Sequence, residues 1–313
     1  MNVLIKLAMT AYITHSDCLL HDMGPYHPEN PQRLKAIAQQ LEATGLIEKL
    51  RCYESPLATD TQLMRVHPLD YIASIREVSP QKGLAYLDPD TAMNPHSLNA
   101  ALRAAGGVIL ATDLVVGQKA NRAFCAVRPP GHHAESTYAM GFCIFNNIAV
   151  GVAHALATHG LQRIAILDFD VHHGNGTEAI FGGNQKVLFC STFQHPFYPH
   201  SGAKTRHSNC ISVPLPAASG GDAFRQAVAA HWLSAVESFK PEMIFISAGF
   251  DAHREDDMAN LMLDDVDYVW ITQQITAWAE QYANGRIVSV LEGGYALNAL
   301  GRCVVQHIKV LCE

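Results

Sequence analysis

The sequence has no C-x-x-C pair among its eight cysteines and no run of lysine or arginine. It also has no apolar run of the roughly 18 residues that span a membrane. The cysteine spacing favours reduced, buried thiols and predicts a cytoplasmic protein. The missing basic run, at a net charge of −7, argues against a nucleic-acid partner and is compatible with a cationic substrate. These absences leave a globular protein that binds neither nucleic acid nor membrane.

No internal repeat, low-complexity tract or linker-like stretch is present, so we expect residues 1–313 to form a single domain. A chain of this length buries a large core and needs neither disulfides nor a partner subunit to fold, although a homo-oligomer remains possible. The apolar segment 1–14 contains a lysine and lacks a convincing cleavage site. We therefore interpret it as a first strand and not as a signal peptide.

Apolar runs of strand length alternate with longer amphipathic segments. Runs that are apolar on both faces predict buried strands of a parallel sheet; they are 123–127, 164–169, 187–191, 243–247 and 287–291. The predicted helices are 31–46, 97–116, 148–159, 222–239, 264–282 and 297–311. Asp222 and Asp264 lie where an acid at a helix N-terminus is favoured. The alternation indicates an α/β protein with helices on both faces of the sheet.

Polar side chains follow four of the predicted strands directly. These side chains are His132 and His133, then Asp168, Asp170 and His172, then Asp251, and finally Tyr295. Ligands of open parallel sheets bind beyond the carboxyl ends of the strands. We therefore expect the four strand ends to build one polar site.

Asp168, Asp170 and His172 are spaced at i, i+2 and i+4, so an extended strand would project all three from one face. Such a cluster is expensive to desolvate without a cation. A divalent metal held by Asp170, His172 and Asp251 relieves that cost and keeps an open position for water, as in catalytic zinc sites. Taken alone, Asp168 or Asp251 could instead cap a helix. His173 points the other way on an extended strand and is not expected to be a ligand.

Six ordered motifs over about residues 10–310 resemble the histone deacetylase family, especially its class II-like and bacterial members. They are HPENPQRL (27–34), RPPGHH (128–133), GFCIFNN (141–147), DFDVHHGNGT (168–177), SAGFDAH (247–253) and LEGGY (291–295). The resemblance implies the three-layer arginase/deacetylase α/β fold, with a central and mostly parallel eight-stranded sheet.

The resemblance also assigns roles to residues of this sequence. Asp170, His172 and Asp251 match zinc ligands, and His132, His133 and Tyr295 match catalytic residues. Asp168, Ser191 and Thr192 match a potassium site, together with main-chain oxygens near Asp168, Asp170 and His172. We expect one zinc ion and one or two potassium ions.

Other motif positions match the substrate channel of the family. Gly141, Phe142 and Tyr198 fall on its walls, and Arg33 matches an arginine in an internal channel that is thought to help acetate leave. Tyr198 stands where many relatives carry phenylalanine. Asn175 replaces the aspartate that pairs with the second active-site histidine in class I relatives, so the pKa of His133 should be lower than with a carboxylate partner.

The implied reaction is hydrolysis of an acetamide. A zinc ion would polarise the carbonyl group and lower the pKa of a bound water toward ~7. We assign His133 as the main general base and acid, while His132, hydrogen-bonded to Asp168, would act mainly through its positive charge. Tyr295 follows a Gly-Gly turn and would donate a hydrogen bond to the developing oxyanion.

The substrate is predicted less directly. Asp88, Asp90 and the acidic stretch after Asp251 favour a cationic substrate, so we expect acetylated di- or polyamines, with the acetyl-lysine of proteins as the alternative. Against polyamines, Met258 stands where one eukaryotic polyamine deacetylase uses a glutamate. A dimanganese ureohydrolase is a rival, but it needs D-x-H-x-D, and Gly174 occupies the last position here. A catalytically silent acetyl-binding module is a second rival.

Overall fold

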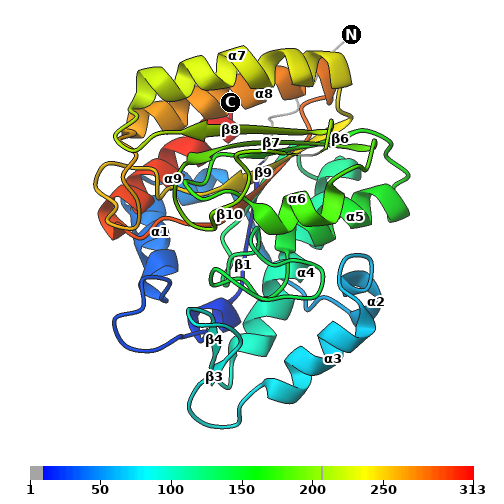
Figure 1. Cartoon of the computed structure of the whole chain (residues 1–313), viewed down its shortest axis with the longest axis vertical. Coiled ribbons are helices and arrows are strands. Elements are labelled where there is room, and N and C mark those ends of the chain that lie inside the picture. Colours follow the sequence, from blue (N-terminus) through cyan, green and yellow to red (C-terminus); the bar gives the residue numbers. More distant parts are fainter. Residues whose placement is uncertain (1–9, 206) are drawn as a thin grey trace.

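The structure is a computed structural model that describes residues 10–205 and 207–313. Its central sheet has eight strands in the order β2-β1-β5-β10-β9-β6-β7-β8, and every neighbouring pair is parallel (Figure 1). The strands are β1 (Thr10–Thr14), β2 (Arg51–Glu54), β5 (Arg122–Cys125), β6 (Ile164–Asp168), β7 (Val187–Gln194), β8 (Cys210–Leu215), β9 (Met243–Ala248) and β10 (Ile287–Leu291). The predicted eight-stranded α/β fold is confirmed.

Helices cover both faces of this sheet. One face carries α4 (Ser97–Val116), α5 (Asn147–Thr158) and α6 (Asn175–Phe181). The other carries α7 (Gly221–Phe239), α8 (Asp265–Tyr282) and α9 (Leu297–Leu311), and α1 (Gln32–Ala43) packs against α9. Figure 1 shows α7 and α8 above the sheet and α5 and α6 below it. The result is a three-layer arrangement.

Short elements extend the molecule around one end of α4 (Figure 1). They are η1 (Ser16–Leu19), α2 (Asp60–Leu63), α3 (Leu69–Val78) and the two-stranded antiparallel pair of β3 (Ala85–Tyr86) and β4 (Ala92–Met93), whereas η2 (Leu46–Lys49) packs against α1. The loop between β3 and β4 contains Asp88 and Asp90, so it carries the predicted acidic rim.

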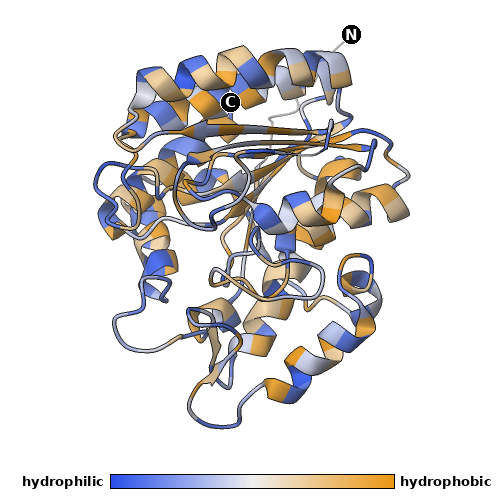
Figure 2. Ribbon diagram, in the orientation of Figure 1, coloured by the Kyte–Doolittle hydropathy of each residue, from blue (hydrophilic) through white to orange (hydrophobic). Residues whose placement is uncertain are grey.

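The strands of the central sheet consist largely of hydrophobic residues, whereas hydrophobic and hydrophilic residues alternate along the outer helices (Figure 2). Every residue of β5, β6, β9 and β10 is buried, so both faces of these central strands are covered. Helix α4 is long and apolar enough to cross a membrane by length and composition, and most of it is buried inside the protein. Its burial between the sheet and α5 is that of a core helix.

Several predicted boundaries differ from the observed ones. The helix predicted over 31–46 ends at Ala43, because Gly45 adopts a left-handed conformation (φ 66°) that stops the helix. Asp264 is the N-cap of α8 and Asp222 lies in the first turn of α7, as predicted. The N-terminal strand is β1; the prediction for residues 1–9 lies outside the described part of the chain.

Candidate metal centre and active site

Four adjacent strands supply the site. β5, β10, β9 and β6 are consecutive in the sheet, and their carboxyl ends lead to the tandem histidines, Tyr295, Asp251 and the Asp168–His172 segment, respectively. These side chains lie close together because the strand order of the sheet places the four strand ends side by side. This is the arrangement that parallel sheets favour for binding sites.

The three predicted ligands converge. His172 Nδ1 lies 3.1 Å from Asp170 Oδ1 and 3.2 Å from Asp251 Oδ2, and all three residues are buried. A tetrahedral zinc ion with ligands at 2.0–2.1 Å separates neighbouring ligand atoms by about 3.3 Å. The Oδ2 atom of Asp251 is buried and has no hydrogen-bond partner. The residues present therefore fit a divalent cation.

The electrostatic environment of Asp251 also indicates a cation site. Burial and the neighbouring Asp170 carboxylate together raise the pKa of Asp251 to about 6. Two carboxylates this close in a buried site disfavour each other's ionised forms, and a bound cation removes that conflict. Gly293 permits the crowding: its amide donates to Asp170 Oδ2 at 2.8 Å, and a Cβ there would lie 1.9 Å from Asp251 Oδ2.

The expectation of an extended D-x-D-x-H strand is wrong in detail. β6 ends at Asp168, and two side-chain turns follow, in which Asp168 Oδ1 accepts from the amide of Asp170 and Asp170 Oδ1 accepts from the amide of His172. These turns aim Asp170 and His172 at Asp251, while the carboxylate of Asp168 faces His132. As predicted, His173 points elsewhere, toward Glu178 at 2.6 Å.

The tandem histidines have different surroundings. His132 Nδ1 lies 3.0 Å from Asp168 Oδ2, which confirms the predicted hydrogen bond. Burial opposes protonation of His132, but Asp170, Asp168 and Glu292 outweigh it and raise its pKa to about 10. His133 Nδ1 instead meets the amide oxygen of Asn175 at 2.8 Å.

The second histidine is held neutral. Burial, followed by the charges of His132 and His172, lowers the pKa of His133 well below its usual range. One imidazole of the pair is therefore a fixed positive charge, and the other is free to accept a proton.

Tyr295 completes this group. Burial raises the pKa of its hydroxyl well above the usual value, so the group stays a hydrogen-bond donor. The guanidinium of Arg33 lies 4.9 Å from the centre of its ring, and Asp256 Oδ2 accepts from its backbone amide at 2.6 Å. The sequence placed Asp256 only in the acidic stretch of the rim; its buried contact with the Tyr295 amide was not predicted, because no sequence signal marks such a contact.

One pocket of about 210 Å³ collects these groups. His132, His133, His172 and Tyr295 line it, and so do five more predicted residues: Asp90, Gly141, Phe142, Tyr198 and Met258. Phe142 packs edge-to-face on Tyr295 at 6.0 Å, and Tyr198 does the same on His133 at 5.2 Å. Pro130, Phe197 and Gly293 also line the pocket and were not predicted.

Two predicted substrate residues do not line this pocket. Asp88 turns into its own loop, where Oδ1 accepts from the amides of Asp90 and Thr91 at 2.9 and 2.6 Å. Arg33 is fully buried behind Tyr295, where it donates to the carbonyl oxygens of Gly294 and Glu292. Asp88 thus shapes the rim loop, and Asp90 is the carboxylate at the pocket.

The potassium prediction concerns buried residues beside the site. Asp168 pairs with Ser191 in register across β6 and β7. Ser191 Oγ lies 3.3 Å from His173 Nδ1, and the Thr192 hydroxyl is buried without a hydrogen-bond partner. Potassium binding here stays a prediction.

A buried ion cluster supports Arg33. Glu29 pairs with Arg33 at 3.1 Å and with both Nε and Nη2 of Arg128, and all three side chains are fully buried. We expect Glu29→Gln to reduce the free energy of unfolding by about 3–5 kcal/mol, because it leaves two buried guanidinium groups uncompensated. Urea denaturation measures the loss.

Asp60→Asn is the matched control for that variant, because it breaks an exposed ion pair with Arg76. Exposed pairs contribute at most about 1 kcal/mol. Equal losses in the two variants would contradict the importance of the buried cluster.

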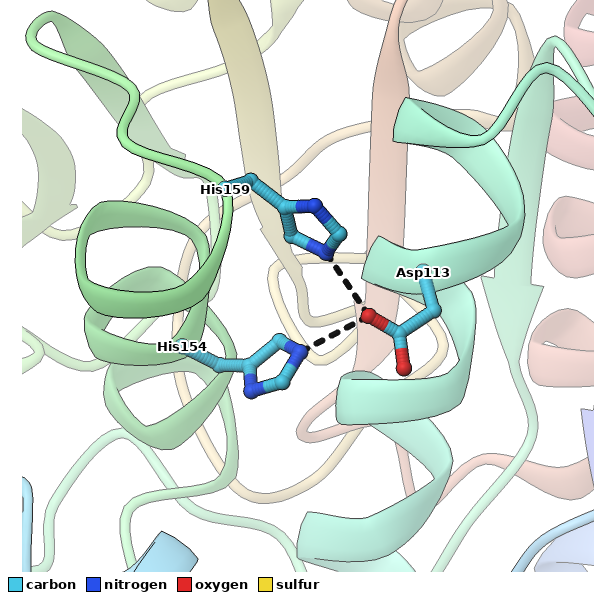
Figure 3. Close-up of side chains that lie close together, drawn as sticks. All are labelled: Asp113, His154 and His159. Atoms are coloured by element: carbon cyan, nitrogen blue, oxygen red, sulfur yellow. Dashed lines mark hydrogen bonds and ion pairs between the residues drawn. The ribbon is translucent and has the colours of Figure 1, made fainter.

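Two further groups of described residues offer three metal-binding atoms each, and hydrogen bonds occupy both. Figure 3 shows one of them: His154 and His159 reach the same Asp113 oxygen, at 2.8 and 2.7 Å. Arg65 donates to His154 Nδ1 at 2.8 Å, so the ring proton lies on Nε2 and faces Asp113. Nε2 of His154 therefore has no free lone pair with which to bind a metal ion.

The other group is His253, Asp265 and Cys303. Arg302 pairs with Asp265 Oδ2 at 3.0 Å, while His253 meets Oδ1 at 2.9 Å. Both carboxylate oxygens are therefore engaged by protein groups. Within the described chain, only the group at the strand ends combines ligand spacing with an unpartnered oxygen.

Comparison with known proteins agrees with this geometry. The family model of the histone deacetylase domain matches residues 27–311. The histone deacetylase-like amidohydrolase of Pseudomonas aeruginosa is 37% identical, with 92% of this chain and 82% of the relative aligned. A probable deacetylase of Archaeoglobus fulgidus is 36% identical, with the same coverage of 92% and 82%.

Other relatives are longer or are known as structures. The chain spans only 21% of Type-2 histone deacetylase 2 of Dictyostelium discoideum, at 34% identity. The crystal structure of the HDA15 HD domain superimposes with a TM-score of 0.92 at 33% identity, and covers 98% of this chain and 88% of that one. With its strand-end site and these matches, the chain belongs to the histone deacetylase family, and this membership supports a hydrolase activity.

Proposed function

We propose that the protein is a zinc-dependent hydrolase that removes acetyl groups from N-acetylated amines, and that acetylated di- and polyamines are its preferred substrates. The observation that carries the reaction is the meeting of Asp170, His172 and Asp251 beside His133 and Tyr295. A silent acetyl-binding module would need none of the proton-transfer groups, so their presence favours an enzyme.

The residues divide the chemistry among them. When bound, a zinc ion supplies a Lewis acid for the amide carbonyl and a water of lowered pKa. His133, kept neutral by its surroundings, takes the proton of the attacking water and then returns it to the leaving amine. His132 stays protonated beside Asp168 and favours the negative charge that develops. Tyr295 donates to the carbonyl oxygen as it becomes an oxyanion.

The preference for a cationic amine rests on charges at the mouth. Asp90 lies on the pocket wall. A second, larger cavity of about 710 Å³ shares Met258 and Tyr295 with the pocket and is lined by Asp22 and Asp257, with Lys35 as its one lysine. An ammonium group several bonds from the acetyl group would lie in this negative field.

A kinetic panel tests the proposal. N-acetylputrescine and N-acetylcadaverine are compared with N-butylacetamide, which lacks the second amine, and with an acetyl-lysine peptide. We expect kcat/KM for the diamines to exceed that for the neutral amide and the peptide, because only the diamines place a free ammonium at the rim.

The outcomes separate the alternatives. Higher kcat/KM for the peptide would make protein acetyl-lysine the substrate and remove the polyamine assignment. Absence of acetate release from every amide, in protein with one zinc ion per chain, would favour the silent binding module. Two manganese ions per chain and urea release would instead point to a ureohydrolase.

A further inference from the structure

Glu292 is a buried carboxylate beside the tandem histidines, and the proposed chemistry gives it no direct contact with the reacting groups. It directly follows β10 and precedes the Gly293–Gly294 turn that leads to Tyr295. Its side chain is fully buried and does not line the pocket. Any effect of Glu292 on the reaction must therefore pass through its neighbours.

Those neighbours are backbone amides of the tandem-histidine loop. Oε2 of Glu292 accepts from the amide of Gly131 at 2.7 Å and from the amide of His132 at 3.1 Å. The two donors are separated from Glu292 by 161 and 160 positions in the chain, so this one oxygen links two strand ends, those of β5 and β10.

The main chain of Glu292 is itself fixed. Its amide donates to the carbonyl oxygen of Ala248 at 3.0 Å, and its own carbonyl oxygen accepts from Arg33. The backbone of Glu292 is therefore held in place, and the length of its side chain determines where the amides of Gly131 and His132 lie.

Asn147 makes a second set of contacts with the same loop. Asn147 Nδ2 donates to the carbonyl oxygen of Pro129 at 3.0 Å, and a Cβ at Gly131 would lie 2.5 Å from the amide nitrogen of Asn147. Asn147 as well as Glu292 therefore holds this loop, which leads directly into His132 and His133.

The second oxygen of Glu292, Oε1, is buried without a hydrogen-bond partner. Burial of a carboxylate with one oxygen unsatisfied is unfavourable, and burial raises the pKa of Glu292 to about 7. The folded protein keeps this group in spite of that penalty, and the two amide contacts are the compensation that the structure provides.

We infer that Glu292 is a positioning residue for deacetylation, which sets the places of His132 and His133 through the two hydrogen bonds of its Oε2. The inference rests on the proposed function. Without these bonds the backbone at Gly131 and His132 shifts, and His133 leaves the position from which it takes a proton. A misplacement of 1 Å costs about 100-fold in rate.

Two conservative variants separate the effect of the side-chain length of Glu292 from the effect of its charge. Glu292→Gln keeps an acceptor at the same distance and removes the charge, whereas Glu292→Asp keeps the charge and shortens the side chain by one methylene. We expect Glu292→Gln to retain most of the wild-type kcat and Glu292→Asp to lose about 100-fold. KM and zinc content should stay at wild-type values in both variants, since the side chain at position 292 touches neither substrate nor metal.

Glu280→Gln is the control, because it neutralises a glutamate that pairs with Arg122 at the opposite end of β5. Normal kcat in Glu292→Asp would overturn the inference, and so would a loss in Glu292→Gln as large as that in Glu292→Asp. If the wild-type protein releases no acetate, the proposed function fails, whereas a fault confined to the variants concerns Glu292 alone.

Discussion

Asp251→Ala is expected to lose the bound zinc ion and to reduce turnover to background. Asp251 is the one ligand that comes from β9, and its Oδ2 faces His172 with no hydrogen-bond partner of its own. Its removal leaves Asp170 and His172, which follow the same strand, and two ligands are fewer than the three that catalytic zinc sites use. Zinc per chain, measured by atomic emission after loading and desalting, checks this result.

The fold should survive this change. The variant also removes the repulsion between the carboxylates of Asp170 and Asp251, which contributes to the raised pKa of Asp251. Asp267→Asn is the matched control: Asp267 is a buried aspartate of α8 that pairs with Arg225. It should keep one zinc ion per chain. A full complement of zinc in Asp251→Ala would remove this residue from the metal centre and would falsify the assigned ligand set.

Tyr295→Phe should keep its zinc ion and lose about 10²–10³-fold in kcat. The hydroxyl is the group lost, and the ring that packs on Phe142 and under Arg33 stays. Because the hydrogen bond strengthens as charge develops on the carbonyl oxygen, the loss should fall on kcat and leave KM nearly unchanged. Steady-state kinetics with the best substrate of the panel measures both constants.

Tyr138→Phe provides the comparison, since Tyr138 is an exposed tyrosine that does not line the pocket. It should behave as the wild-type protein does. A Tyr295→Phe variant of normal kcat would show that oxyanion stabilisation comes from elsewhere in the site, whereas a variant that has lost zinc would mean that Tyr295 supports the metal centre.

The parts of the fold that the sequence predicted well are those that burial alone determines. The bounds of β10, α4 and α9 agree with the predictions, because each is a continuous apolar or amphipathic run with clear ends. β2 was not predicted, since it is mostly exposed at the edge of the sheet and has no apolar pattern.

The residues of the site divide in the same way. His132, His133 and Tyr295 follow strands directly, so strand recognition and parallel topology were enough to bring them together. Glu292 and Asp256 act through backbone amides that lie 160 and 39 positions away in the chain. No local pattern encodes such partners, and the same holds for the inward turn of Asp88.

The strand order has a consequence for assembly of the sheet during synthesis of the chain. β10 is the last strand to be synthesised, yet it lies between β5 and β9 near the middle of the sheet. Until residues 287–291 emerge, the group β2-β1-β5 and the group β9-β6-β7-β8 share no strand pairing. Strand pairing between the strand that carries the histidine loop and the strands that carry the aspartate ligands is therefore complete only when the last-made strand is in place.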